Sequence, residues 1–200
     1  STREGGPASS IRIRRDGSDR LVQVLAFGPS EQRQPVLGAG GGRLLATWVE
    51  MENEELTFRS ASLTAEGEPL SQRILSRGSS GALDMAWNGQ EFLALHWDEE
   101  RLLATRLTID GEPVGQHPVV IGDCRDCSWP IPGVTVTWAG SRWAIAWAAG
   151  DRLRYATVSR LGTVLPPTDL MFATPIREHW FRFYEDVALS FDGKRLVIVW

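Results

Sequence analysis

Two tryptophans in long connections are the first side chains that could recognise a ligand. Trp129 lies in the connection 122–133, and Trp180 lies in the connection 174–184, directly after His179. An exposed indole can stack on the apolar face of a sugar ring while neighbouring polar groups bind the hydroxyls. The competing interpretation is that both indoles cap the hydrophobic core beneath their own loops.

Two carboxylates could complete such a site. Asp84 and Asp186 both stand where apolar, strand-like segments begin. Glycoside hydrolases use a pair of carboxylates, one as general acid and one as base or nucleophile, so these two could also cleave a glycan. Their other interpretation is that they close turns. The apolar segments 36–37 and 134–137 hold no third acid.

The sequence contains none of the common catalytic motifs: no Gly-x-Ser-x-Gly, no His-Glu-x-x-His and no phosphate-binding glycine loop followed by a helix. We therefore expect a non-catalytic binding site without a cofactor, and a glycan-active hydrolase or lyase is the alternative. The predicted ligand-binding residues are Asp84, Trp129, His179, Trp180 and Asp186.

The two cysteines, Cys124 and Cys127, have a Cys-x-x-Cys spacing that admits a redox pair, half of a zinc site or a small disulfide loop. Zinc needs two further ligands, yet there is no second Cys-x-x-Cys and the three histidines stand singly. We expect a structural disulfide or two thiols and no metal site. A disulfide favours a secreted or cell-surface protein.

Length, composition and charge limit the classes of partner and fold that remain. A formal net charge of −4 with both signs interspersed gives no reason to expect a nucleic-acid partner. No apolar run approaches the roughly 18 to 20 residues that span a bilayer, so membrane insertion is not expected. The length of 200 residues suits one domain. Residues 1–10, rich in Ser, Gly and Pro, are expected to be a disordered lead-in without a leader sequence.

The elements that must position these residues recur with a period of about 50 residues. Each copy has a strand, a tight turn and a second strand. The copies cover 42–48, 87–97, 138–147 and 191–200. Asn88-Gly89 and Asp192-Gly193 are strong hairpin signals, because both turn residues tolerate positive φ.

A tryptophan closes each copy. Trp48, Trp97, Trp147 and Trp200 follow one another at intervals of 49, 50 and 53 residues. We expect these four side chains to be buried in equivalent positions of the repeat.

A second hairpin follows each of the first three tryptophans, at 63–67, 107–111 and 158–162. Every repeat therefore contributes four strands, A to D. Strand B carries apolar residues on both faces, as in 143–147, which is expected of a strand covered above and below. Helical spacing is not sustained anywhere, which excludes folds with crossover helices.

These alternating Trp-x-Gly and Asp-Gly units resemble the β-propeller repeats of secreted and surface proteins of bacteria. The resemblance implies an all-β propeller, most simply four blades of four antiparallel strands. It implies binding of carbohydrate or a protein partner, or scaffolding, because the same scaffold hosts lectins, adhesins and glycan-active enzymes. It also implies that the A strands line a channel, and that the B–C turns and D-to-A connections share one face.

That face would carry acidic B–C turns around Glu50, Glu55 and Asp98. They either attract a cation or a basic partner, or they are solvated turns without a ligand.

The repeat boundaries predict blades at about 36–80, 81–122 and 133–172, and a composite blade from 184–200 plus 11–30, all within one domain at 11–200. In this arrangement strand 11–15 pairs with strand 195–200 and closes the ring, which removes open strand edges. The alternative is that the chain forms part of a larger propeller.

Overall fold

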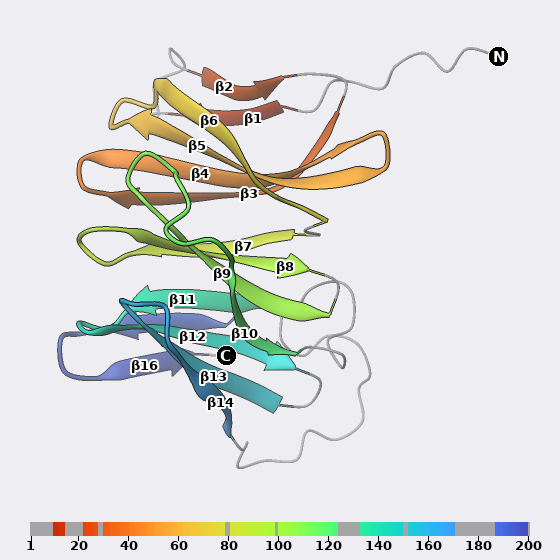
Figure 1. The fold of residues 1–200 in the computed structure, drawn as a ribbon. Coiled ribbons are helices and arrows are strands. Elements are labelled where there is room, and N and C mark those ends of the chain that lie inside the picture. The colour runs from red at the N-terminus through yellow and green to blue at the C-terminus, as the bar shows by residue number, and fades with distance from the viewer. Residues whose placement is uncertain are drawn as a thin grey trace.

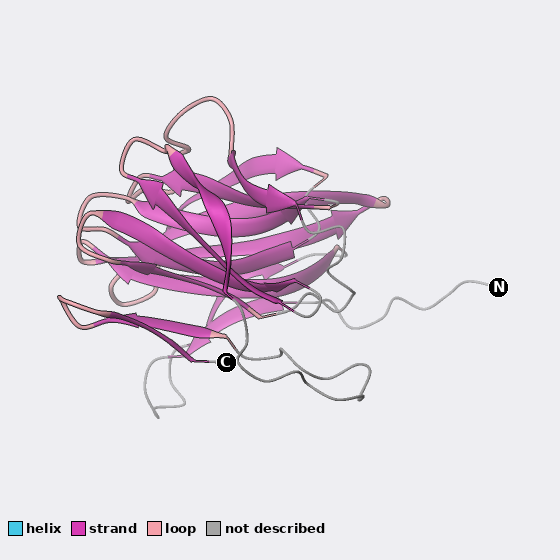
Figure 2. Cartoon of the chain, turned by 90° about the horizontal axis from the view of Figure 1, so that it is seen from below, coloured by secondary structure: helices cyan, strands magenta, loops and turns pink. Residues whose placement is uncertain are grey.

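The computed structural model describes residues 10–14, 22–27, 30–78, 81–98, 100–123, 133–149, 152–170 and 187–199. Every element in these ranges is a β-strand, as Figure 2 shows. The predicted lead-in lies outside these residues, apart from Ser10. Within the described part of the chain, no helix has the length and apolar character needed to cross a membrane.

Twelve of the strands form three four-stranded antiparallel sheets in which the strands follow one another in chain order (Figure 1). The first sheet contains β3 (Glu31–Gly40), β4 (Arg43–Glu52), β5 (Glu55–Thr64) and β6 (Pro69–Arg77). The second contains β7 (Gly81–Trp87), β8 (Phe92–Asp98), β9 (Arg101–Leu107) and β10 (Val119–Asp123). The third contains β11 (Val134–Trp138), β12 (Arg142–Ala149), β13 (Arg152–Ser159) and β14 (Val164–Leu170).

Two-stranded antiparallel sheets flank these three at either end of the stack (Figure 1). One is β1 (Ser10–Arg14) with β2 (Val22–Phe27), and the other is β15 (Ala188–Phe191) with β16 (Leu196–Val199).

The turns between the first two strands lie where the sequence predicts them, but in Asn88-Gly89 and Asp192-Gly193 only the glycines have positive φ, at 97° and 93°. Gly41 and Gly42 adopt φ values of 58° and 76°, which glycine reaches without a steric cost. In the second sheet, the side-chain oxygen of Asn88 accepts hydrogen bonds from two following backbone N–H groups, and Asp192 does the same in the last hairpin. These local hydrogen bonds stabilise each turn.

The sheets stack face to face, and their cores lie between neighbours. Apolar residues of β4 and β5 pack against β7 and β8, and those of β8 pack against β12. The first strands also contact one another in the order β3, β7, β11, β15. Strands β8 and β12 are buried along nearly their full length, because each is covered on both faces.

The closing tryptophans are buried as predicted at Trp48, Trp97 and Trp147, while Trp200 lies outside the described residues. Their predicted equivalence is wrong for Trp97. Trp87 pairs with Phe92 across its turn, and Trp138 pairs with Trp143 across the equivalent turn. Because both pairs are five positions apart, the two hairpins can be aligned at these residues.

Trp147 comes nine residues after Trp138, whereas Trp97 comes ten residues after Trp87. Because side chains alternate between the faces of a strand, this single extra residue turns Trp97 toward the third sheet. The position that faces the first sheet is taken by His96, which stacks on Phe58.

The predicted ring closure is also wrong. Strand β1 pairs with β2, strand β15 pairs with β16, and these are separate sheets at opposite ends of the stack (Figure 1). At the junction of the second and third sheets, the outer strands β10 and β14 contact each other, as the inner strands β7 and β11 do. Sheets that touch at both edges turn little from one to the next, so the three complete sheets and the two two-stranded sheets form an open arc.

Candidate functional site

Asp84 is the one predicted ligand-binding residue whose surroundings the structure describes. It follows a bulge in β7, and its carboxylate faces the third sheet. One oxygen accepts a hydrogen bond from the backbone N–H of Met85 at 2.8 Å, and the other accepts one from the N–H of Val136 at 2.7 Å. The carboxylate therefore links strand β7 to strand β11.

Burial raises the pKa of Asp84 above its ordinary value. The backbone hydrogen bonds from Val136 and Met85, and one from the side chain of Thr135, favour the charged form and partly offset this effect. With both oxygens bound by backbone groups, Asp84 has the surroundings of a structural carboxylate.

The other four predicted residues, Trp129, His179, Trp180 and Asp186, lie outside the described residues. The same holds for Cys124 and Cys127. Their segments join β10 to β11 and β14 to β15, so they attach at the end of the sheets that also carries the B–C turns. Whether the two tryptophans approach Asp84 stays a prediction.

The acidic turns at this end are paired with arginine. Glu50 lies 2.6 Å from the Nε of Arg59 and also accepts a hydrogen bond from the Ser30 hydroxyl. Arg77 lies 2.7 Å from Glu55. The Asp98 carboxylate lies 2.5 Å from Arg101 in the same way. These contacts favour solvated turns over a site for a cation or a basic partner.

The opposite end of the sheets, where the hairpin turns lie, carries a cluster that the sequence did not indicate. The Arg160 guanidinium lies 5.3 Å from the ring centroid of Trp138, and its Nη2 donates to the backbone oxygen of Asn88 at 3.4 Å. The Trp138 ring meets Trp143 edge-on, with centroids 5.1 Å apart. The cation–π contact lies within the third sheet, and the hydrogen bond from Arg160 to Asn88 links this sheet to the second.

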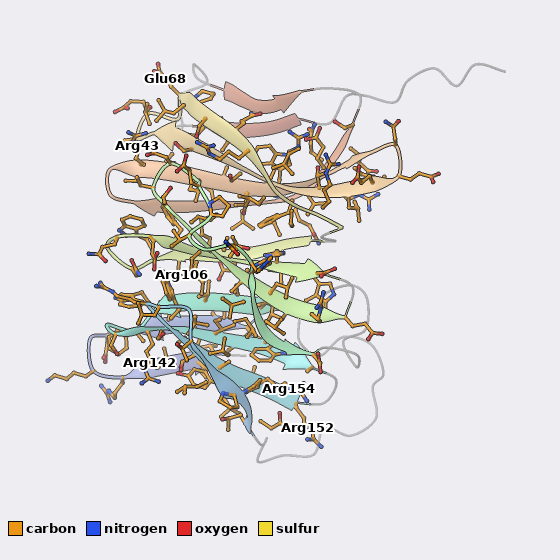
Figure 3. All side chains as sticks on the ribbon, in the orientation of Figure 1. Arg43, Glu68, Arg106, Arg142, Arg152 and Arg154 are labelled. Carbon is orange, nitrogen blue, oxygen red and sulfur yellow. The ribbon has the colours of Figure 1, made fainter. Side chains whose placement is uncertain are left out.

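A two-pronged ion pair lies in the second sheet at the same end. The Nε and Nη2 of Arg106 donate to the two carboxylate oxygens of Glu91, at 3.0 and 2.8 Å. Both side chains are largely buried. Figure 3 shows Arg106, with Arg43 and Arg142, along the hairpin-turn side of the stack.

These side chains interact with one another within their own sheets, and the hydrogen bond from Arg160 to Asn88 joins the second and third sheets. In the part of the chain that the structure describes, no three His, Cys, Asp or Glu side chains gather closely enough to hold a metal ion.

Solved structures resemble the stack of sheets. TolB from Acinetobacter baumannii matches with a TM-score of 0.54 and 12% identity, over 94% of this chain and 42% of that one. The fold is that of a β-propeller. Each four-stranded sheet is thus a blade, and each two-stranded sheet is a half-blade.

Two further structures match more distantly. The β-propeller domain of the Trilobed protease from Pyrococcus furiosus matches with a TM-score of 0.45 and 6% identity, over 86% of this chain and 57% of that one. The D477G ACO/RPE65 chimera matches with a TM-score of 0.42 and 10% identity, over 76% and 42% of the two chains.

These likenesses show the fold alone, since identity is low and the chain spans less than half the length of the TolB structure. No protein-family model matches the chain, and no curated protein sequence matches it.

Proposed function

We propose that this propeller is a non-catalytic binding module that recognises a carbohydrate, or a protein partner, at the end of the blades that carries the B–C turns. The observation that supports this is the bonding of Asp84. A glycoside hydrolase needs two carboxylates that face a common space, one of them free to exchange a proton with the substrate. Both carboxylate oxygens of Asp84 instead accept hydrogen bonds from backbone N–H groups.

The first strands of the blades support the same conclusion. Among the described residues of β3, β7, β11 and β15, the only Asp or Glu besides Asp84 is Glu31, which is paired with Arg33 at 2.8 Å. The described first strands therefore offer Asp84 no unpaired second carboxylate to act as base or nucleophile. Binding without bond cleavage is the function that these strands can support.

The ligand contacts in this proposal come from Trp129, His179, Trp180 and Asp186. Both connecting segments attach at one end of the blades, and the proposal assigns one ligand to side chains of both. The indoles would stack on a sugar ring or on an apolar side chain, and His179 and Asp186 would bind hydroxyl or amide groups. A secreted or cell-surface location, without a nucleic-acid partner, belongs to the same proposal.

A thermal-shift and calorimetric screen against mono- and oligosaccharides tests this function. A ligand at 100 times its Kd adds about 2.7 kcal/mol to the free energy of unfolding, which is a measurable rise in Tm. We expect Trp129→Ala and Trp180→Ala each to abolish the shift. Leu161→Ala is the matched control, because Leu161 is 86% exposed in a turn at the opposite end of the blades.

Two results would contradict the proposal. One is the absence of any sugar ligand in the screen and in a glycan array, which would contradict recognition of a carbohydrate. The other is hydrolysis of a glycan that Asp84→Asn abolishes, which would establish the catalytic alternative.

A further inference from the structure

One guanidinium binds the ends of two outer strands that belong to neighbouring blades. Arg154 of β13 stands opposite Asp169 of β14, and its Nε donates to the carboxylate Oδ1 at 3.0 Å. The Nη1 of Arg154 donates to the backbone oxygen of Asp123, the last residue of β10, at 3.1 Å. Arg154 therefore joins the end of β14 in the third blade to the end of β10 in the second.

The packing beneath this link brings Arg154 within reach of β10. Arg154 pairs with Trp147 on β12, and directly paired residues place their side chains on the same face of a sheet. A Cβ atom at Gly122 would lie 3.1 Å from the Trp147 ring and 3.5 Å from Pro167. Because glycine has no side chain, β10 lies against the third blade here, and the Asp123 carbonyl lies beside the guanidinium.

A second arginine holds the carboxylate of Asp169. The Nη1 of Arg152 lies 2.8 Å from its Oδ2. The hydrogen bond from Arg152, followed by the one from Arg154, holds the pKa of Asp169 below its ordinary value although desolvation acts in the opposite direction. Asp169 thus stays charged at neutral pH and orients Arg154. Figure 3 shows Arg152 and Arg154 on the opposite side of the stack from Arg142 and the hairpin turns.

The other junction between complete blades carries no guanidinium at this position. There the residue equivalent to Arg154 is Leu103, which pairs with His96 and is buried. Strand β6 leads into β7 through three residues, whereas β10 and β14 lead into connections of ten and seventeen residues. The link therefore lies where two long connections begin from outer strands that contact each other.

We propose that Arg154 is a positioning residue, which fixes the separation at which the connections after β10 and β14 begin. This inference deepens the proposed function, because these connections carry Trp129 and Trp180, and it rests on that function only for its effect on ligand binding. Two loop ends held at a fixed separation lower the ordering cost of a ligand that contacts both loops.

The effect of Arg154 should be local. Its side chain is 29% exposed and that of Asp169 is 36% exposed. Ion pairs at such exposed positions contribute little to global stability. Replacing Arg154 should therefore release the two strand ends and leave the free energy of unfolding nearly unchanged.

Amide hydrogen exchange and trypsin cleavage test the link without a ligand. In Arg154→Gln the amides of Asp123 and Leu170, at the two strand ends, should exchange at least about fivefold faster than in the wild type. Trypsin should also cleave faster after Arg125 and Arg177, one in each connection. A merely stabilising role predicts a different result, namely faster exchange throughout the third blade.

Arg59→Gln is the matched control. Arg59 occupies the equivalent position in the first blade, opposite Trp48, and its guanidinium binds Glu50 of its own blade. This variant should leave cleavage of both connections and exchange at the ends of β10 and β14 unchanged. A change in Arg59→Gln as large as that in Arg154→Gln would overturn the positioning role.

Calorimetry with cellotriose, maltotriose and chitotriose measures the effect on binding. Arg154→Gln should weaken by about tenfold the binding of any of these sugars that the wild type binds, and Arg59→Gln should not. A wild type that binds none of them counts against carbohydrate recognition alone, since exchange and cleavage still decide the role of Arg154. Unchanged exchange and cleavage in Arg154→Gln, or unchanged affinity for a bound sugar, would overturn the inference.

Discussion

His96 occupies the position on β8 that tryptophan occupies on β4 and β12, and it has no exposed surface. Its ring stacks on Phe58, with centroids 4.5 Å apart, and its Nε2 lies 2.9 Å from the hydroxyl of Thr105. Burial lowers the pKa of His96 to about 4, although the charge of Asp98 acts in the opposite direction. This imidazole is therefore a neutral core residue at physiological pH.

The buried neutral state of His96 makes stability depend on pH. The unfolded chain binds a proton near pH 6.5, whereas the folded chain binds it only near pH 4. As the pH falls between these values, the unfolded state gains a proton that the folded state lacks. The free energy of unfolding should therefore fall, by about 3 kcal/mol at most.

Urea unfolding of the wild type and His96→Gln at pH 7 and pH 4.5 measures this effect. The stability difference between the two proteins should shrink at the lower pH, because glutamine does not titrate. A difference that stays constant with pH would show that His96 is already accessible to protons in the folded state.

Gly40 shows how closely neighbouring blades approach. A Cβ atom at this position would lie 2.3 Å from the indole ring of Trp87 in the next blade. We expect Gly40→Ala to lower the free energy of unfolding by about 1–3 kcal/mol, because the ring must move out of its packed position. Chemical denaturation gives the value.

A double-mutant cycle identifies the cause. In a Trp87→Leu background the cost of Gly40→Ala should largely disappear, since the smaller side chain leaves room for the methyl group. Gly42→Ala is the comparison variant, because nothing lies within 4 Å of its added Cβ and its cost comes from the positive φ alone. An equal cost of Gly40→Ala in both backgrounds would contradict the proposed clash.

At the scale of the strands, each hairpin is stabilised locally, and the second and third blades are joined by their shared apolar core and by polar contacts between their strands. Asp84 is such a contact, since it binds the N–H of Val136 on β11. Replacing it with alanine should cost about 1–3 kcal/mol, because the Val136 N–H then has no carboxylate partner in a partly buried strand.

Urea unfolding measures that cost, and amide hydrogen exchange locates it. The Val136 and Met85 amides should exchange faster in Asp84→Ala than in the wild type, while amides of the first blade should not change. Asp110→Ala is the matched control, because that carboxylate is exposed and forms a longer ion pair, at 3.3 Å to Arg43. Unchanged exchange at Val136 in Asp84→Ala would show that Asp84 does not hold the two blades together.

At the scale of the whole molecule, the contacts of the outer strands decide the shape. The site of a Cβ on Gly122 of β10 lies 3.1 Å from Trp147 and 3.5 Å from Pro167 of β14, so the outer parts of these blades are in close contact. At the first junction, Ser71 and Arg73 of β6 bond to the turn that ends the third strand of the second blade. Blades held together along their full width form a shallow arc with two open ends.

The sequence by itself determined the local units: the strands, the hairpin turns and the burial of Trp48, Trp97 and Trp147. These depend on residues close in the chain, namely on turn residues that accept positive φ or bond their own backbone and on runs of apolar residues. It also indicated the stacking of blades, because strand 143–147 is apolar on both faces.

The tertiary structure alone decided the rest. One extra residue in β8 reverses the face of Trp97, and a spacing between tryptophans cannot show which face each one occupies. The structural role of Asp84 depends on a backbone N–H 52 residues away. The open arc depends on contacts between outer strands such as β10 and β14. The angle between blades is set by packing between residues far apart in the chain, and no local pattern in the sequence records it.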